Sequence, residues 1–201
     1  MALVAEYALT PDVFDESCYG SAEVCGVLLQ GIKEVLLHEA LVRDLRNGDW
    51  GRSFAATSRP WSRRGKELLR KLVTQRRLLP CAPASTSTPV TDAAWCAEAL
   101  GSHAARALTG IIVSDALGPA YRGNAQVAAL GSIAGAAWWA SRSPSIRLAR
   151  TLAAYQAVLE LVVRHANSMM LIDPYFDPTR GFRDIVTVLA GAGGWRAPLP
   201  G

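Results

Sequence analysis

The sequence lacks the residue patterns from which several common functional sites are built. Its 4 cysteines form no C-x-x-C pair, which excludes a zinc ribbon and a thioredoxin-like redox motif. Neither a G-x-G-x-x-G after a predicted strand nor a G-x-x-x-x-G-K-[ST] motif occurs, so the phosphate cradles of dinucleotide-binding and P-loop proteins are missing. The serine of GSIAG, residues 131–135, stands one place too early for the G-x-S-x-G turn of a serine hydrolase.

Signals for export and for membrane insertion are also missing. The N-terminus has no basic n-region, and Glu6 interrupts its apolar run, so no signal peptide is predicted. The longest uncharged stretch, between Arg122 and Arg142, is too rich in glycine and polar residues for a membrane span. Together with the unpaired cysteines, these features predict a cytoplasmic protein with reduced thiols and no membrane segment.

The sequence does contain abundant apolar residues and an uneven distribution of charge. Half of its 201 residues are apolar, which is enough for a core, and the formal net charge is +4. The segment from Arg59 to Arg77 holds eight basic residues and one acid, Glu67, so it carries +7 and the rest of the chain −3. Such a segment favours a partner that bears phosphates or acidic side chains.

Periodicity and turn residues predict the elements of the first half of the chain. We expect a strand over residues 3–8 and a helix over 21–45 that Ser21 caps. A second helix over 62–78 is amphipathic and basic. Its apolar side consists of Leu68, Leu69, Leu72 and Val73. Residues 80–91, rich in Pro, Ser and Thr, predict a linker or a long surface loop.

The second half predicts helices that alternate with buried strands. A helix from residue 92 to about residue 100 precedes a strand over 109–115, whereas 116–141 show no single period. A helix over 144–166 leads into the run SMMLIDPYFDP and then into another helical segment. This order predicts the α/β fold class, with a largely parallel sheet flanked by helices.

The predicted elements divide the chain into three parts. Residues 1–79 hold a strand and helices that include the basic helix, 80–91 form the linker or loop, and 92–201 form the α/β domain. No strand follows Gly193-Gly194, so either the fold closes there or the chain is the front part of a longer protein. The unfinished sheet favours the second alternative.

The turn Asp173-Pro174-Tyr175-Phe176-Asp177-Pro178 is the sharpest local motif. It ends a predicted parallel strand, where open α/β sheets place their ligands. Asp173, Tyr175 and Asp177 are therefore candidate catalytic residues, and the two carboxylates are candidate ligands for Mg²⁺ or Mn²⁺, with Asp115 from a neighbouring strand as a third. The alternative is a structural turn that covers the end of the sheet.

LIDPYFDP, between two helices, resembles the strand and turn of phospholipase-D-like domains in bacterial conflict and defence proteins. The resemblance covers about residues 144–195 and implies phosphodiesterase or nuclease-like chemistry. The signature of that superfamily is H-x-K followed by Asp, and none of His38, His103 and His165 begins it. The resemblance therefore implies a non-catalytic member or a fragment whose nucleophile lies beyond Gly201.

The basic helix and a tryptophan pair are the candidate binding surfaces. On a helix the basic side chains can contact several phosphates of a nucleic acid at once. The alternatives are that they contact an acidic protein or face only solvent. The predicted nucleic-acid-binding residues are Arg59, Arg63, Arg64, Lys66, Arg70, Lys71, Arg76 and Arg77. Trp138 and Trp139 are either core residues or anchors of a protein interface.

These observations leave three functional hypotheses. The leading one is a nucleic-acid-binding accessory or nuclease-related subunit, as in a bacterial defence system, that is catalytically incomplete in this chain. The second is a non-enzymatic subunit of a larger protein complex, with the basic helix and Trp138-Trp139 as contacts. The third is a metal-dependent hydrolase that uses Asp173 and Asp177. No other cofactor and no oligomeric state are predicted.

Overall fold

The computed structural model describes residues 5–56, 58–142, 147, 149, 151–165 and 187. They belong to two compact units, one of residues 5–142 and the other containing the described part of residues 143–201. The sheet, the buried core and the pocket discussed below all belong to the first unit. The predicted strand that ends at Asp173 lies outside the described residues, as does the helix predicted after it except for residue 187.

The first unit is built on one five-stranded sheet in which every pairing is parallel. Its strands are β1 (Ala5–Leu9), β2 (Ala40–Asp44), β3 (Leu78–Pro80), β4 (Gly110–Val113) and β5 (Val127–Ala129). They lie in the order β3-β2-β1-β4-β5. This confirms the predicted α/β class. The direction of winding reverses between β1 and β4, and the carboxyl ends of these two strands form the switch point at which open α/β sheets bind ligands.

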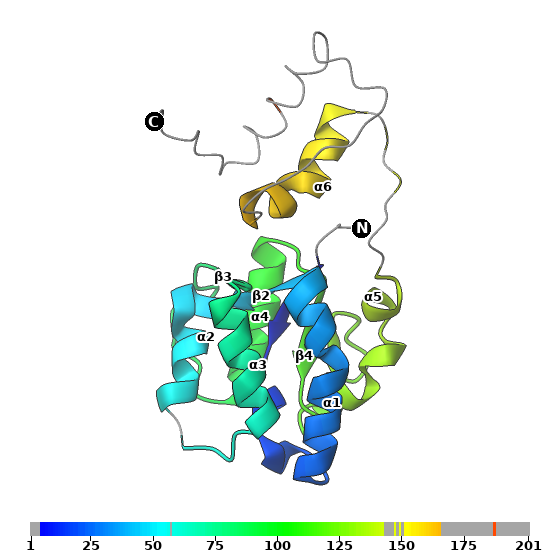
Figure 1. Ribbon diagram of the computed structural model, residues 1–201. Coiled ribbons are helices and arrows are strands. Elements are labelled where there is room, and N and C mark those ends of the chain that lie inside the picture. The colour runs from blue at the N-terminus through cyan, green and yellow to red at the C-terminus, as the bar shows by residue number, and fades with distance from the viewer. Residues whose placement is uncertain are drawn as a thin grey trace, which may run out of the picture. The chain divides into compact units, whose positions relative to one another are not determined.

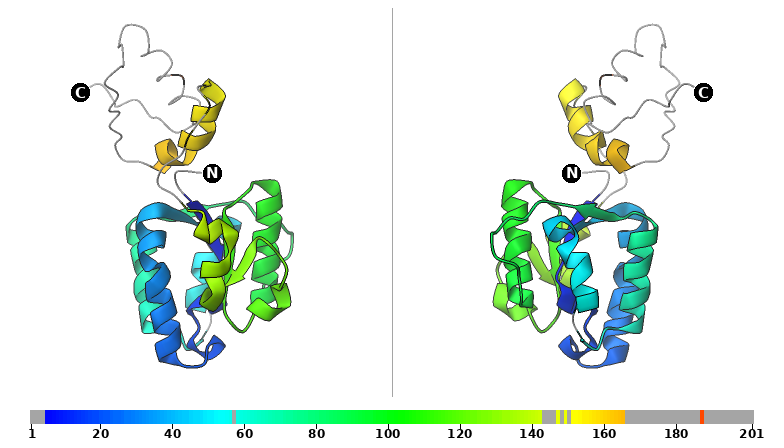
Figure 2. Two further views of the ribbon diagram at one scale, coloured as in Figure 1. Left: turned by 90° about the vertical axis from the view of Figure 1, so that its right-hand side faces the viewer. Right: turned by 90° about the vertical axis from the view of Figure 1, so that its left-hand side faces the viewer.

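Helices cover both faces of the sheet. α1 (Ala22–Glu34) and α3 (Arg63–Thr74) pack side by side on one face, and α4 (Asp92–Ala105) covers the opposite face (Figures 1 and 2). α2 (Leu45–Ala56) follows β2 and packs against β2 and β3. α1, α3 and α4 each begin at the carboxyl edge of the sheet, so their N-termini lie near the switch point.

Side-chain caps start two of these helices, and one of them is the predicted cap Ser21. The Ser21 side chain accepts a hydrogen bond from the Val24 N–H at 3.2 Å, and the Thr91 side chain accepts one from Ala94 at 3.2 Å. Both bonds satisfy amide groups that a helix N-terminus leaves without a partner. On α3 the predicted apolar side is only partly correct, because Leu68 and Leu72 are buried but Val73 is 56% exposed.

The predicted helix over 21–45 is wrong in its second half. Regular α-helix ends at Glu34, a π-helical turn spans Val35–Glu39, and Ala40–Asp44 form strand β2. Residues 40–42 pair with residues 5–7 of β1 and are buried. A short, continuously buried apolar run fits a central parallel strand and a buried helix equally well, so periodicity could not separate them.

The predicted division at residues 80–91 also differs from the structure. β1 and β2 precede this segment, β3 ends at its first residue, Pro80, and β4 and β5 follow it, yet all five strands form one sheet. The segment is a surface loop fastened to the unit by Glu98, whose carboxylate accepts hydrogen bonds from the Ala84 N–H and the Ser85 hydroxyl, both at 2.6 Å. Arg46 donates to the Ser85 carbonyl at 2.7 Å. The N-terminal part therefore supplies three of the five strands of the sheet.

A buried ion pair joins the two central strands. Glu6 on β1 accepts a hydrogen bond from the Arg43 guanidinium of β2, whose side chain is 1% exposed. The remaining guanidinium N–H groups bond to Ser102, at its carbonyl (2.8 Å) and its hydroxyl (2.9 Å), and to the carbonyls of Arg106 (2.7 Å) and Ala107 (3.2 Å). Arg43 thus ties β2 to Ser102 in the last turn of α4 and to the carbonyls of the two residues that follow the helix.

Short elements complete the description. The first unit ends with α5 (Ala137–Ala140), which follows four 3₁₀ turns at Pro11–Phe14, Glu16–Cys18, Gly118–Tyr121 and Leu130–Gly135. The second unit contains α6 (Leu152–His165), which lies within the helix predicted over 144–166. Among the described residues, no helix has the length and apolar character needed to cross a membrane.

Replacing Arg43 by methionine should destabilise the protein strongly. The substitution keeps an apolar stem but removes the donor to the Arg106 and Ala107 carbonyls and one of the two cations that bond to Glu6. Losing one partner of a buried pair costs about 3–5 kcal/mol. Urea unfolding of Arg43→Met should show this loss. The exposed Arg52→Met, whose partner is Asp49, should lose at most about 1 kcal/mol. Equal losses would contradict the role assigned to Arg43.

Candidate functional site

The acidic turn predicted as a catalytic or metal site lies outside the described residues. This applies to Asp173, Tyr175 and Asp177 and to their expected role as Mg²⁺ or Mn²⁺ ligands. Within the described part of the chain, no group of three or more His, Cys, Asp or Glu side chains has an arrangement that could hold a metal ion. The site described here therefore consists of other residues.

The basic segment forms an exposed row on α3. Arg63, Lys66 and Arg70 lie at successive turns of the helix and line a groove of about 310 Å³ together with Glu67. Glu67 is engaged by two lysines, Lys71 at 3.0 Å and Lys33 at 3.9 Å. The hydrogen bond from Lys71 is the main reason why the pKa of Glu67 is lowered. The single acid of the row is thus neutralised by its neighbours.

The other predicted members of this surface have different surroundings. Arg64 is exposed and donates to the Gly26 carbonyl of α1 at 3.1 Å, and Arg76 and Arg77 follow the helix. Arg59 is separate from the row, because its guanidinium bonds to both Asp92 oxygens at 2.9 Å and lies 3.8 Å from Asp15. Arg59 is therefore an internal cross-link at the carboxyl edge of the sheet, and the remaining seven residues form the basic surface.

Cations elsewhere in the first unit mostly have partners. Arg43 and Arg106 pair with Glu6, Arg46 and Arg52 with Asp49, and Arg59 with Asp92. By contrast, no described carboxylate lies at ion-pair distance from six members of the basic surface. These are Arg63, Arg64, Lys66, Arg70, Arg76 and Arg77. Unpaired positive charge is thus concentrated on α3 and the turn that follows it.

The tryptophan pair belongs largely to the core. Trp139 is 7% exposed, and the rings of both Trp138 and Trp139 contact Tyr7 of β1, with centroids 5.7 and 5.5 Å away. A Cβ atom added at Gly110 would lie 2.4 Å from the Trp138 indole, so Gly110 makes room for that ring. The structure therefore supports the core alternative for Trp139, and Trp138 is half-buried beside it.

Three carboxylates that the sequence did not single out gather near the switch point. Asp12 follows β1, Asp15 lies one turn further along, and Asp92 begins α4. Arg59 bridges Asp15 and Asp92, and the Asp15 side chain accepts from the Ser17 N–H at 2.9 Å. Asp12 accepts a hydrogen bond from the Ser114 hydroxyl at the end of β4. This bond joins the carboxyl ends of the two strands between which the winding reverses.

Asp12 is the least compensated of these carboxylates. It is 2% exposed, and its Oδ1 atom has no hydrogen-bond partner in the described structure, whereas Oδ2 is held by Ser114. Burial is the main cause of the raised pKa of Asp12, which hydrogen bonds from Ser114 and Thr10 partly offset. A buried carboxylate with a free oxygen costs folding free energy, which is typical of positions retained for function.

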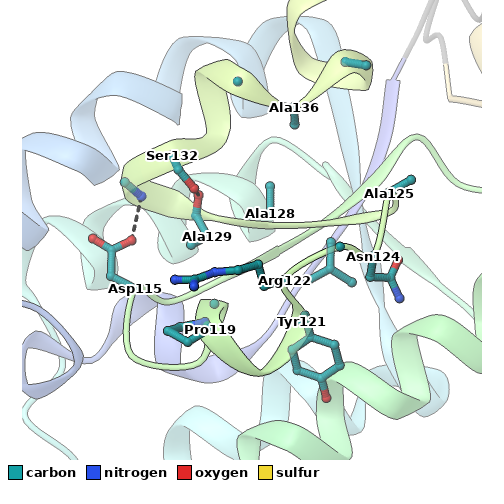
Figure 3. A pocket seen from close by; sticks show the side chains of 16 residues that line it. Asp115, Pro119, Tyr121, Arg122, Asn124, Ala125, Ala128, Ala129, Ser132 and Ala136 are labelled. Atoms are coloured by element: carbon teal, nitrogen blue, oxygen red, sulfur yellow. Dashed lines mark hydrogen bonds between the residues drawn. The ribbon is translucent and has the colours of Figure 1, made fainter.

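A pocket of about 710 Å³ lies along the edge strand β5 and is lined by Asp115, which follows β4, by β5 itself and by the segments before and after β5 (Figure 3). Asp115 forms one wall, and its Oδ1 accepts a hydrogen bond from the Gly131 N–H at 2.7 Å. Arg122 extends across the pocket toward Asp115, and Ser132 lies on the same rim (Figure 3). Asp115, which the sequence offered as a third metal ligand, follows β4 two residues after the strand ends at Val113.

Comparisons with protein-family models, with curated proteins and with solved structures find no match to this chain. The functional argument therefore depends on the geometry alone.

Asp12→Asn should change how stability depends on pH. Because folding raises the pKa of Asp12, its ionised form opposes folding at neutral pH, and protonation removes this cost as the pH falls. The stability of Asp12→Asn relative to wild type should therefore be greatest near pH 7. This advantage should shrink as the pH falls toward 3.8, the pKa of the Asp side chain in the unfolded state. Urea titrations at several pH values measure this difference. A difference that is constant or that grows at low pH would contradict the prediction.

Proposed function

We propose that the protein binds nucleic acid through the sugar–phosphate backbone, using the exposed cations of α3 and of the turn that follows it. The observation that carries the proposal is the concentration of unpaired cations on α3, in a fold whose other cations mostly have carboxylate partners. Guanidinium and ammonium groups without local partners are the groups that neutralise phosphates and release counterions.

The spacing of the row suits a charged strand. Arg63 and Arg70 are seven residues apart on α3, which is about 10.5 Å along a helix axis, or about three nucleotide rises of 3.4 Å. Lys66 lies between them on the same groove. Three successive cations can thus meet phosphates of one strand, and contacts to phosphates carry no sequence information. We therefore expect binding without strong sequence preference.

Arg76 provides a second argument. It ends α3 in the left-handed region, with φ 54°, and the next amide, that of Arg77, donates to the Leu72 carbonyl at 2.8 Å. Glycine is the usual residue at this helix-ending position, because a side chain there costs about 1–2 kcal/mol. An arginine at a position that favours glycine extends the cationic surface beyond the helix, which supports a role for its charge.

The proposal concerns binding and leaves catalysis open. The nuclease-like activity depends on the turn at 173–178, which lies outside the described residues. A role as a subunit of a bacterial defence system and a cytoplasmic location are compatible with the proposal and remain hypotheses. A protein partner with an acidic face could occupy the same surface, and the experiment below distinguishes it.

Replacing Arg63 and Arg70 by glutamine should weaken binding and reduce its dependence on salt. For a labelled single-stranded oligonucleotide, fluorescence anisotropy across a salt series gives the slope of log K against log salt concentration. Each lost phosphate contact should reduce the magnitude of this slope by about 0.7, and by about 0.9 for a duplex. For a single strand, the magnitude of the slope should therefore be smaller by about 1.4 in the double variant than in the wild type, by the same relation.

A variant of equal net charge provides the control. Arg52→Gln with Arg142→Gln removes two cations that are engaged within the fold, by Asp49 and by the face of Trp139. This control should keep the wild-type slope. No binding by the wild type at low salt would overturn the proposal and leave an acidic protein as the partner of α3. Equal effects of the two double variants would show that only net charge matters.

A further inference from the structure

We infer that the pocket beside Asp115 binds a phosphorylated ribose, either in a free nucleotide or at the 3′ end of an RNA strand. This inference concerns the pocket along β5 and uses no residue of α3, so it stands independently of the proposed function. It rests on a fixed carboxylate, on an arginine opposite it, and on a wall of small residues between them (Figure 3).

Asp115 is positioned as a hydrogen-bond acceptor for hydroxyl groups. The Gly131 N–H holds Oδ1 at 2.7 Å, and no described residue donates to Oδ2. A Cβ atom at position 131 would lie 2.5 Å from Oδ2, so glycine is needed for this close approach of the backbone. A carboxylate fixed at the end of a parallel strand, with one oxygen free, can accept hydrogen bonds from the vicinal hydroxyls of a ribose, as in dinucleotide-binding folds.

Arg122 supplies the complementary positive charge. It follows the 3₁₀ turn Gly118–Tyr121 and precedes Gly123, whose φ of 93° turns the chain. Its side chain extends across the pocket (Figure 3), yet it forms no ion pair with Asp115 or with another described carboxylate. The space between the two charges thus remains open to a ligand. A guanidinium matches the geometry of a phosphate through two parallel hydrogen bonds.

The rest of the lining suits a sugar and a flat ring. Ala128, Ala129 and Ala136 place only methyl groups against the pocket, and the Ser132 hydroxyl and the Asn124 amide add neutral hydrogen-bonding groups at the rim (Figure 3). The volume of about 710 Å³ lies within the range of about 300–1,000 Å³ found for small-molecule sites. A phosphate on one side, hydroxyls on the other and an apolar wall between them together describe a ribonucleotide.

Calorimetric titration of the full chain tests the inference. The probes are ribose 5-phosphate, AMP, adenosine and 2′-deoxy-AMP. We expect saturable binding of AMP, with adenosine and 2′-deoxy-AMP each weaker by about ten- to hundredfold, the range for one hydrogen bond to a charged group. Arg122→Gln should lower the affinity for AMP to that for adenosine and leave the affinity for adenosine unchanged. Asp115→Asn should abolish the preference for AMP over its 2′-deoxy form.

Matched variants keep the test decisive. Arg52→Gln removes an exposed arginine outside the pocket and should bind AMP as the wild type does, as should the Arg63→Gln, Arg70→Gln double variant. If Asp115→Asn fails to fold, because Asp115 also anchors Gly131, Arg122→Gln alone still decides. Absence of saturable binding for every probe, or AMP affinity unchanged in Arg122→Gln, would overturn the inference.

Two RNA hexamers identify the source of the ribose. One ends in a free 2′,3′-diol and the other in a 3′-phosphate that blocks the diol. Competition with bound AMP by the first hexamer alone would assign the pocket to an RNA end. Saturable AMP binding that neither hexamer displaces would assign it to free nucleotides.

Discussion

The Arg43 guanidinium, buried between β2 and the C-terminal end of α4, determines much of the architecture. It pairs with Glu6 on the neighbouring strand and donates hydrogen bonds to Ser102 of α4 and to the carbonyls that follow the helix. Removing this group from water is costly, so it is stable only while β1, β2 and α4 are all in place. By fixing the C-terminal end of α4, Arg43 also directs the N-terminal end, with Asp92, to the carboxyl edge of the sheet.

The distribution of charge connects this interior to the surface. Glu6, Glu98 and Asp92 each pair with arginines of the unit's interior or edge, namely Arg43, Arg46 and Arg59. These acids are not available to neutralise α3, whose single acid already engages Lys71 and Lys33. The cationic row therefore follows from how the fold uses its carboxylates, which a count of net charge does not reveal.

Sequence patterns predicted those elements that local chemistry defines. β1, α3, α4 and β4 were anticipated because apolar period, caps and turn residues agree in each. β2 was missed because the apolar repeat of α1 continues into it without a break. Without β2 the sheet order could not be derived, so Asp12 and Ser114, more than 100 residues apart, could not be placed together. Arg59 was grouped with the row because its partners, Asp15 and Asp92, are defined by tertiary structure alone.

The central claim, that α3 binds a nucleic-acid backbone, is tested most directly by mapping contacts on the wild-type protein. In an NMR titration with a single-stranded DNA of about twelve nucleotides at low salt, we expect the largest amide and side-chain shifts at Arg63, Lys66, Arg70 and Arg76. These shifts should reverse when salt is added, as release of counterions requires. Large shifts that avoid α3, or no shifts at low salt, would contradict the account.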